Sequence, residues 1–316
     1  MTYNSREEIG GCLRSLSEVQ EIVVIDNASA DGTQEVLRKA DGIAVVENVQ
    51  NRGFAAAVNQ GVRASTAPYI LLLNPDVTLL DGLGPLLSSA DRHGAAAGQL
   101  VGIDGLPQVG FTIRRFPTAL SLSFMALGVN RFWRSNAVDR QYRYVDHDLQ
   151  AGCVVDQPAG AFLVVRRDVF EGVGGFDESF WPVWFEDVDF CQRLYGAGHS
   201  IWYEPAVRAR HTGGHSVSRL RVSERALYWN VSLLRYAGKY FPRLVFTVIA
   251  AAVGAGAFLR MMAGITLGRE VSAAYARVLR LAVKSVLLGR VPDVFSAAPG
   301  GGKEREGAAA LSHPVQ

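Results

Sequence analysis

Residues 21–33 read EIVVIDNASADGT, and this stretch decides the fold of the 316-residue chain. It opens with a short apolar run, typical of a buried strand, and ends in turn-forming and helix-capping residues. A short apolar run followed by a helical segment recurs at 43–65, and a third apolar run lies at 69–73. Because this alternation is typical of right-handed βαβ units, the sequence predicts an α/β fold with a mostly parallel sheet flanked by helices.

Two carboxylates follow the ends of predicted strands. Asp26 comes directly after the run 21–25, and Asp76 closes the turn Asn74-Pro75-Asp76 after the run 69–73. Ligands of such sheets bind beyond the carboxyl ends of the strands, so the two aspartates indicate a binding site. The alternative is a local role, because aspartate is common at helix caps and in turns.

The C-terminal part of the chain is basic and apolar. Residues 225–292 contain ten Lys/Arg against one acid, Glu270, although the net charge of the whole chain is only +2. Residues 244–259 carry no charge, and residues 278–291 are amphipathic and basic. This pattern favours an anionic membrane surface over a nucleic acid as partner. A helical bundle with solvated basic faces is the alternative.

Two other nucleotide-binding classes lack their motifs here. A dinucleotide-dependent oxidoreductase requires Gly-x-Gly-x-x-Gly after a strand, and the chain has no such motif. A sugar-nucleotide pyrophosphorylase would need a glycine-rich, arginine-bearing loop after its first strand, which is also missing from the sequence. Neither class is therefore favoured.

A series of motifs resembles, in order, that of the family 2 glycosyltransferases with the GT-A fold. The motifs are TYNS at 2–5, IDNASADGT at 25–33, NRGFAAAVNQG at 51–61, LNPD at 73–76, GGFDE at 174–178, EDVD at 186–189 and HTGGHS at 211–216. Within the family the chain is similar to the rhamnosyltransferase-type branch, which builds bacterial surface polysaccharide on a lipid carrier.

The resemblance implies a domain organisation. A GT-A domain is expected over 1–224, with a nucleotide-binding half at about 1–103 and an acceptor half at about 104–224. A basic, apolar, membrane-associated helical region is expected at 225–292, and a disordered tail at 293–316. Within the acceptor half, the Arg- and aromatic-rich residues 112–150 are expected to be an insertion that shapes the cleft.

The resemblance also implies an inverting, metal-dependent sugar transfer to an acceptor hydroxyl. Asp187 is the expected general base, and Asp76 and His211 are the expected metal ligands, with His215 as a competitor of His211. A divalent cation, Mn²⁺ or Mg²⁺, would neutralise charge on the leaving diphosphate, and a histidine ligand favours Mn²⁺. The alternatives are helix charge compensation for Asp187 and an ordinary cleft histidine for His211.

Contacts to both substrates are expected from further motif residues. Asp26 can accept a hydrogen bond from a pyrimidine imide, which predicts a dTDP- or UDP-linked donor. The nucleotide-sugar residues are expected to be Thr2, Tyr3, Asn4, Asp26, Asn27, Asn51, Gly53, Asn59, Asn74 and Asp76. The expected acceptor residues are Trp181, Glu186 and Asp189, where Trp181 belongs to an aromatic group with Phe180 and Trp184 that is either a sugar-stacking platform or core packing.

The expected acceptor is a glycan or a polyprenyl-linked sugar. Together with the basic C-terminal region, this predicts peripheral or monotopic attachment to the cytoplasmic face of the bacterial inner membrane, with a true span at 244–268 as second choice. The three cysteines match no zinc spacing and indicate reduced thiols in a cytosolic compartment. A catalytically inactive membrane scaffold of the same fold is the alternative function.

The start of the chain departs from the family pattern. That pattern has an apolar strand directly before Thr-Tyr-Asn, whereas Met1 stands there in this sequence. Loss of a central strand exposes apolar neighbours and unpaired backbone groups. We therefore expect the natural protein to be longer, and an intact-mass measurement with Met1 as the true start would refute this.

Overall fold

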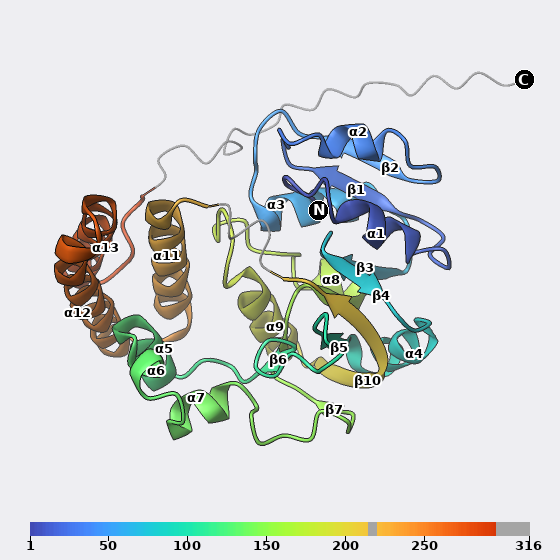
Figure 1. Cartoon of the computed structure of the whole chain (residues 1–316). Helices are drawn as coiled ribbons and strands as arrows, with labels where there is room; N and C mark the ends of the chain where they lie inside the picture. The colour runs from blue at the N-terminus through green and yellow to red at the C-terminus, as the bar shows by residue number, and fades with distance from the viewer. Residues whose placement is uncertain (214–219, 295–316) are drawn as a thin grey trace, which may run out of the picture.

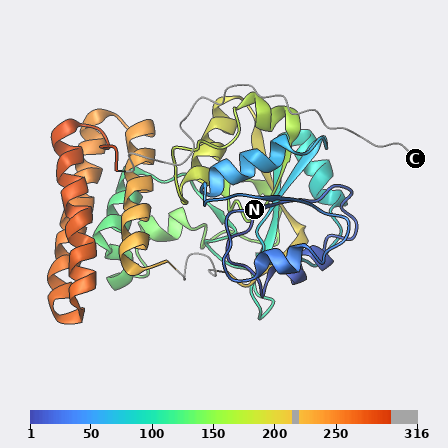
Figure 2. The same cartoon turned by 90° about the horizontal axis from the view of Figure 1, so that it is seen from above.

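The computed structural model describes residues 1–213 and 220–294, and it places an α/β domain beside a helical bundle (Figures 1 and 2). In both views the bundle of α11, α12 and α13 lies at one end of the molecule, and α5 packs beside it against α12. His215 and residues 295–316 lie outside the described residues, so the predictions for them are not tested.

The N-terminal layer contains the stretch that decides the fold. Strand β1 (Val23–Asp26) pairs in parallel with β2 (Ala44–Glu47), as predicted. Helices α1 (Ile9–Arg14), α2 (Thr33–Leu37) and α3 (Phe54–Arg63) accompany them. Ile9, Val24 and Leu37 form the small hydrophobic cluster of this layer, so the strands and their helices are held by apolar packing.

The larger sheet has the strand order β3-β9-β5-β10-β4, with β7 paired to β10. Its strands are β3 (Tyr69–Leu73), β4 (Val77–Leu79), β5 (Gly94–Val101), β7 (Cys153–Val154), β9 (Phe162–Arg166) and β10 (Ser200–His211). Only β5 and β10 run parallel, and the other pairs are antiparallel.

The α/β class predicted from the sequence is confirmed, but the larger sheet is mixed rather than mostly parallel. The difference arises because β9, which is distant in sequence, inserts between β3 and β5 and runs antiparallel to both. The alternation of strands and helices along the sequence indicates how successive elements connect. It does not show that a strand distant in sequence will insert between two others.

A hollow separates the two sheets, which no hydrogen bond joins within the described chain. It measures about 710 Å³ and is lined by β1 and β3 together with α1 and α3. Thr2 forms an isolated parallel bridge with Asp26 on the edge of β1 opposite β2. Two strand edges therefore lie beside the hollow. One is the edge of β3 that pairs with no described strand, and the other is the edge of β1 that bridges to Thr2.

The remaining elements of the α/β domain surround the sheet. Helices α4 (Gly84–His93), α8 (Arg167–Gly172) and α9 (Glu186–Gly196) pack against it, and β6 (Ile113–Arg114) pairs with β8 (Gln157–Pro158). The insertion predicted at 112–150 contains the short helices α5 (Ala119–Leu127), α6 (Val129–Phe132) and α7 (Ala137–Tyr142). Arg114 and Phe116 of the insertion contact α9 through Asp187 and Tyr195, whereas Phe132 and Trp133 are exposed.

The bundle consists of α11 (Val222–Tyr240), α12 (Arg243–Leu267) and α13 (Arg269–Leu288). The boundary expected at residue 224 therefore falls inside α11. Moreover, Leu122 of α5 and Phe185 and Val188 near the start of α9 belong to the same hydrophobic cluster as the bundle. The bundle thus shares a core with α5 and the start of α9.

Candidate active site

A cleft of about 830 Å³ lies at the carboxyl end of β3, between the sheet, α9 and the insertion. It brings together six of the residues predicted from the sequence to form the site: Tyr3, Asn74, Asp76, Glu186, Asp187 and His211. These residues come from segments up to about 200 positions apart, so the fold alone makes them neighbours. Ligand pockets of this size are typical of small-molecule sites.

Asp76 and His211 face each other in this cleft. The Nε2 atom of His211 lies 3.5 Å from Oδ2 of Asp76, and both side chains are about nine-tenths buried. Their positions are fixed by pairing of β10 with β4 and by the backbone amide of Thr212, which donates to the carbonyl of Asp76. The pair predicted to hold a metal is therefore in contact.

Gln108 fixes the ring of His211. Its Oε1 lies 2.9 Å from Nδ1 of His211, its Nε2 donates to the backbone carbonyl of His211, and Phe111 stacks on the ring at 4.8 Å. Because an amide oxygen only accepts, Nδ1 carries the proton of the neutral ring, and Nε2 is left with its lone pair toward Asp76. Ligand histidines in metalloproteins have this arrangement.

The donor set fits a divalent cation that is shared with a substrate. One carboxylate and one imidazole nitrogen suit Mn²⁺, but the described residues contain no cluster of three or more His, Cys, Asp or Glu that could hold a metal. Two protein ligands leave most coordination positions to other oxygen donors. Diphosphate oxygens are donors of that kind.

Asp187 lies in the first turn of α9 and is held on three sides. Arg114 of β6 lies 3.6 Å from its Oδ2, and the backbone amides of Gly160 and Val188 donate to its two oxygens at 3.4 and 2.8 Å. The carboxylate side chain retains 18% exposure toward the cleft. It is thus oriented, partly accessible and within reach of a substrate hydroxyl in the same cleft.

The backbone just before α9 adopts a rare conformation. Trp184 has a φ of 79° and Phe185 a φ of 69°, both in the left-handed region that bulky residues avoid. Strain of this kind persists only where surrounding packing imposes it, and Phe185 is buried in the cluster shared with the bundle. The bundle core therefore helps to aim Glu186 and Asp187 at the cleft.

Glu186 is the acid whose pKa is perturbed. Its side chain is buried, its Oε2 has no hydrogen-bond partner among the described residues, and burial followed by the charge of Asp187 raises its pKa well above the usual range. The raised pKa favours the protonated form of Glu186 beside Asp187. Protonation of Glu186 relieves the repulsion between the two neighbouring carboxylates.

Glu186→Gln should make the protein more stable at neutral pH. The pKa of Glu186 is raised in the folded protein, so its ionisation destabilises the fold. The free energy of unfolding of wild type should therefore decrease as pH rises from about 4.3, the pKa in the unfolded chain, to the pKa in the folded protein. The loss is about 1.4 kcal/mol for each pH unit that separates the two pKa values. Thermal unfolding measured from pH 4.5 to 8 should show the advantage of Glu186→Gln growing with pH. The exposed Glu35→Gln is the control, and an advantage independent of pH would contradict this assignment.

Asp26 lies outside the cleft lining, buried at the end of β1. Its Oδ2 accepts hydrogen bonds from the Ser29 amide and from the Gln34 side chain, at 3.2 and 2.8 Å. Its Oδ1 is buried without a partner among the described residues. A buried acceptor without a donor is costly, so this oxygen is suited to a ligand N–H.

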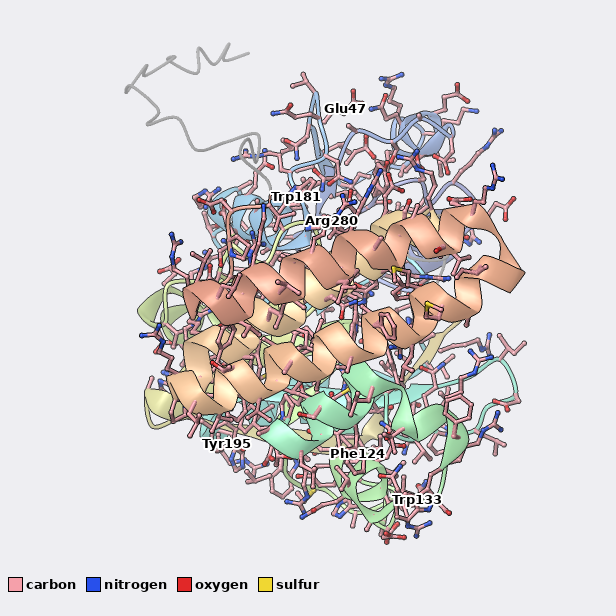
Figure 3. All side chains as sticks on the ribbon, turned by 90° about the vertical axis from the view of Figure 1, so that its left-hand side faces the viewer. Glu47, Phe124, Trp133, Trp181, Tyr195 and Arg280 are labelled. Atoms are coloured by element: carbon pink, nitrogen blue, oxygen red, sulfur yellow. The ribbon has the colours of Figure 1, made fainter. Side chains whose placement is uncertain are left out.

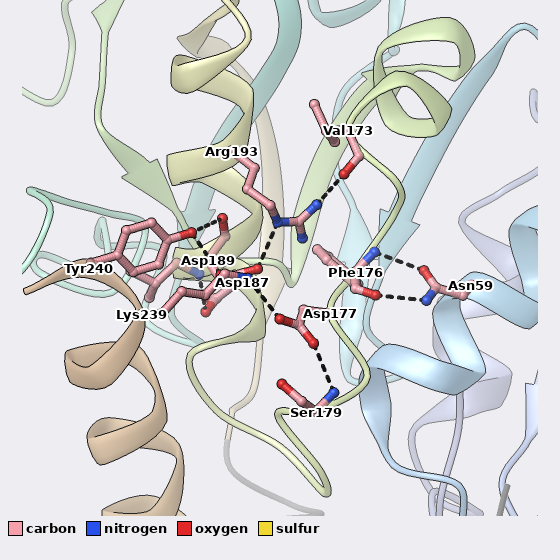
Figure 4. Close-up of polar contacts among 11 residues, drawn as sticks. Asn59, Val173, Phe176, Asp177, Ser179, Asp187, Asp189, Arg193, Lys239 and Tyr240 are labelled. Carbon is pink, nitrogen blue, oxygen red and sulfur yellow. Dashed lines mark hydrogen bonds and ion pairs between the residues drawn. The ribbon is translucent and has the colours of Figure 1, made fainter. Parts of the chain in front are cut away.

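Four of the residues predicted to contact the nucleotide instead organise loops. The Asn27 amide donates to Asn51 Oδ1 and to the Gly53 carbonyl, at 2.8 and 3.2 Å. The Asn59 side chain pairs with both backbone groups of Phe176, as Figure 4 shows. In this structure these groups bond within the protein, and none of the four residues lines the cleft.

Thr2 and Asn4 likewise serve the backbone of this half. The Thr2 amide donates to the Ile25 carbonyl, and the Asn27 amide donates to the Thr2 carbonyl. The side chain of Asn4 accepts from the Ala30 amide at 2.8 Å. Tyr3 alone of the TYNS motif's three predicted contact residues lines the cleft.

Two of the three residues predicted to bind the acceptor do not lie in the cleft. Asp189 is fully buried and is held by Arg193, Lys239 and Tyr240 at 2.7–2.8 Å, so it joins α9 to α11 (Figure 4). Trp181 packs against Gly53, where an added Cβ would come within 2.7 Å of its ring. Both side chains therefore have packing roles in this structure.

The sequence left two roles open for the aromatic group of Phe180, Trp181 and Trp184: a sugar-stacking platform or core packing. The structure gives members of this group different environments. Phe180 is buried in the core shared with the bundle, whereas Trp184 lines the cleft together with Trp229 of α11. Sugar rings stack on such indole faces. Trp184 and Trp229 are therefore two aromatic side chains of the cleft lining on which a sugar ring could stack.

Sequence reasoning missed Gln108 and Trp229, and it noted Arg114 only as part of an Arg- and aromatic-rich insertion. All three line the cleft. The composition of 112–150 was a usable signal for Arg114. No local pattern marks Gln108, because its role depends on the fold that brings 108 next to 211.

The fold and the cleft define a glycosyltransferase of the GT-A fold. Residues 1–171, more than half of the chain, match the family described as glycosyl transferase family 2. The chain therefore belongs to that family. The match ends before Asp187 and His211, so the placement of those two residues rests on the geometry described above.

Curated relatives cover most of the chain. It is 29% identical over 262 residues to the N-acetylglucosaminyl-diphospho-decaprenol L-rhamnosyltransferase of Mycobacterium tuberculosis, covering 76% of this chain and 83% of that protein. It is 28% identical over 239 residues to the rhamnosyltransferase WbbL of Escherichia coli, covering 72% and 85%. The recognition of a rhamnosyltransferase-like family 2 member is confirmed.

Among solved structures, the chain resembles GalNAc-T7 with UDP, GalNAc and Mn²⁺. The TM-score is 0.54 and the identity 12%, and the alignment covers 92% of this chain and 55% of that one. The chain thus spans little more than half of that protein. At this identity the likeness shows the fold alone, and it confirms the GT-A prediction.

Proposed function

We propose that the protein transfers a sugar from a dTDP- or UDP-linked donor to a hydroxyl of a lipid-linked or glycan acceptor, with inversion. The observation that carries this proposal is the convergence of Asp76, His211 and Asp187 on one cleft. The two rhamnosyltransferase relatives support rhamnose as the sugar. Cell-surface polysaccharide is the product class in this proposal.

Asp187 acts as the general base in this proposal. Its carboxylate takes the proton of the acceptor hydroxyl as the acceptor oxygen bonds to the anomeric carbon and the electron pair of the breaking bond leaves with the diphosphate. A single displacement of this kind inverts the anomeric centre. Arg114, 3.6 Å away, helps to hold the carboxylate in place in the cleft.

Asp76 and His211 hold the divalent cation in this proposal, and the cation supplies positive charge to the leaving diphosphate. Gln108 keeps His211 Nε2 available by accepting from Nδ1–H. Mn²⁺ in the solved structure with the similar fold supports this cofactor. Asp26 Oδ1, buried without a partner among the described residues, would accept the imide N–H of the uracil or thymine base.

The membrane partner is supported by an exposed apolar row on α12, here called the α12 stripe. Its members recur at helical spacing along one side of the helix: Leu244, Val248, Ala251, Ala255, Phe258, Leu259, Met262 and Ile265. Soluble surfaces rarely expose so long an apolar row. Cationic Arg277, Arg280 and Lys284 are exposed on the neighbouring α13, which suits an anionic bilayer surface.

The packing of the bundle favours attachment in the membrane plane over a span. Residues Arg243–Ile265 are the one helix of the described chain with the length and hydropathy of a span, and a third of its most apolar window is buried inside the protein. In Figure 3, α12 and α13 lie side by side and form the outer face of the bundle, with Arg280 on α13. A span would separate α12 from α5 and draw the α13 cations into hydrocarbon.

Phe258→Glu should weaken binding to vesicles that contain anionic lipid by roughly tenfold or more. The change replaces an exposed side chain whose burial in the bilayer contributes about 2 kcal/mol by a charge. Vesicle co-sedimentation of the full chain without detergent measures it. Val49→Glu, at a side chain 98% exposed in the α/β domain, is the matched control. Equal binding by wild type and Phe258→Glu, or no vesicle binding by wild type, would refute attachment through the α12 stripe.

A panel of nucleotide sugars tests the proposed function. Purified full-length protein with Mn²⁺ should release nucleoside diphosphate from a pyrimidine donor and much less from GDP-sugars. dTDP-rhamnose is the expected best donor. Turnover of purine-linked donors alone would contradict the role given to Asp26, and no turnover with any donor would contradict the transferase proposal.

A further inference from the structure

A second, smaller cavity adjoins the active-site cleft. It measures about 180 Å³ and lies between α5, α11, α12 and α13. Trp229 lines both cavities, and on α5 the cleft is lined by Met125 while the small cavity is lined by the next residue, Ala126. A cavity of this size is too small for a nucleotide sugar but has room for a phosphate-sized group.

The small cavity is cationic. Arg225 and Arg260 line it with Asn230 and Tyr275, and none of its lining residues, all within the described chain, is acidic. In the part of the chain that the structure describes, neither arginine forms an ion pair. Unpaired guanidinium groups that converge on one cavity are a recognition device for phosphate oxygens.

The two arginines differ in how firmly they are held. Arg260 Nη1 donates to the backbone carbonyls of Ala126 and Gly256 at 2.6 and 3.0 Å, and its guanidinium lies 5.7 Å from the Tyr275 ring centre. Arg225 is exposed, and its guanidinium makes no such contact with the described residues. One fixed and one adjustable guanidinium thus flank the cavity.

The α12 stripe passes beside this cavity. Phe258 and Leu259, both exposed, precede Arg260 in the chain. The order along the molecule is therefore the catalytic cleft, the Trp229 wall, the cationic cavity and then the apolar stripe. This order matches a molecule that has a sugar, a diphosphate and a hydrocarbon chain in sequence.

We infer that the cavity of Arg225 and Arg260 binds the diphosphate of a lipid-linked acceptor. Its sugar lies in the cleft near Asp187 and Trp229, and its hydrocarbon chain lies along the α12 stripe. The inference rests on the proposed function and deepens it, because it selects a lipid diphosphate over a free glycan as acceptor. It also gives the bundle a role in substrate recognition besides attachment.

Binding of a prenyl diphosphate without a sugar tests the inference apart from catalysis. The probe is titrated into full-length protein in non-ionic detergent, in parallel with the prenyl alcohol, with inorganic diphosphate and with vesicles of phosphatidylglycerol. Wild type should bind prenyl diphosphate at least tenfold more tightly than the alcohol or inorganic diphosphate. Inorganic diphosphate binding as tightly as prenyl diphosphate would overturn the assignment to a lipid, and displacement of the probe by phosphatidylglycerol would overturn the assignment to a diphosphate.

Arg225→Gln should weaken prenyl diphosphate binding roughly tenfold, since it removes one charge-assisted hydrogen bond. The exposed Arg225 makes no fold-supporting side-chain contact in the described chain, whereas Arg260 joins α12 to α5 and is not a suitable target. Arg63→Gln, which removes the same charge from an exposed position of α3 outside the lining of both cavities, should leave binding unchanged. Equal effects of the two variants would overturn the inference.

The two proposals fail separately. If wild type transfers sugar but Arg225→Gln binds prenyl diphosphate like wild type, the cavity assignment is wrong and the transferase proposal stands. If the probe binds as expected but no donor is turned over, the transferase proposal is wrong.

Discussion

Asp187→Asn lowers turnover by roughly 10²–10⁴-fold while donor affinity stays within about twofold of wild type, because general-base loss affects only the chemical step. Asparagine keeps the shape of the side chain and its place beside Gly160 and Val188, but it cannot take the acceptor proton. Single-turnover rates with saturating donor and acceptor, together with donor titration, measure the two quantities.

The matched control is Asp41→Asn, at an exposed position outside the cleft lining. Asp187→Asn also leaves Arg114 without its ion-pair partner, so the melting temperature should be recorded beside the rate. A variant that is folded, binds donor and turns over like wild type would exclude Asp187 as the base.

Asp76→Ala should lower kcat/KM on the order of a hundredfold or more and should weaken donor binding as well. The carboxylate acts through the cation on the diphosphate, which is charged both in the bound donor and in the transition state, so affinity and rate fall together. Chelator treatment of wild type should produce the same change, and Mn²⁺ should reverse it in wild type but not in Asp76→Ala.

Calorimetric titration with Mn²⁺ and nucleoside diphosphate supplies a readout independent of turnover. Wild type should bind the pair together more tightly than either alone, because Asp76 and His211 supply only two side-chain ligands and the described residues contain no cluster of three or more His, Cys, Asp or Glu that could hold a metal. Full activity of wild type in excess chelator would show that this enzyme does not use the cation.

Much of the fold was predictable because its core strands are short apolar runs bounded by turn-forming and helix-capping residues. The run at 69–73 is strand β3 residue for residue, and the stretch that opens with 21–25 contains β1. The mixed direction of the larger sheet was not predictable, because β9 reaches its place between β3 and β5 through long-range pairing. Local periodicity carries no record of that pairing.

The sequence predicted the residues at the centre of the candidate site but not those at its edges. Asp76, Asp187 and His211 stand in local motifs and meet in the cleft. Asn59 and Asp189 stand in equally clear motifs, yet their side chains hold neighbouring backbone and α11. A motif identifies residues that the fold requires, whether for ligand contact or for packing, and only the burial and partners of each side chain separate the two.

Arg114, Gln108 and Trp229 are the opposite case, because they line the cleft although no motif marks them. Each lies in a segment without a recognisable motif, and each reaches the cleft because a distant element places it there. Arg114 contacts Asp187 from β6, and Gln108 contacts His211 from the loop after β5. Residues that position other functional groups are therefore the part of the site that sequence alone reports least well.

The measurement that tests the central claim most directly is sugar transfer itself, followed on the acceptor by mass spectrometry and by the anomeric proton signal of the product. With dTDP-rhamnose, Mn²⁺ and a lipid-diphosphate-linked sugar, wild type should add one deoxyhexose with inverted anomeric configuration, and Asp187→Asn should not. A product of retained configuration, or equal transfer by wild type and Asp187→Asn, would contradict the account.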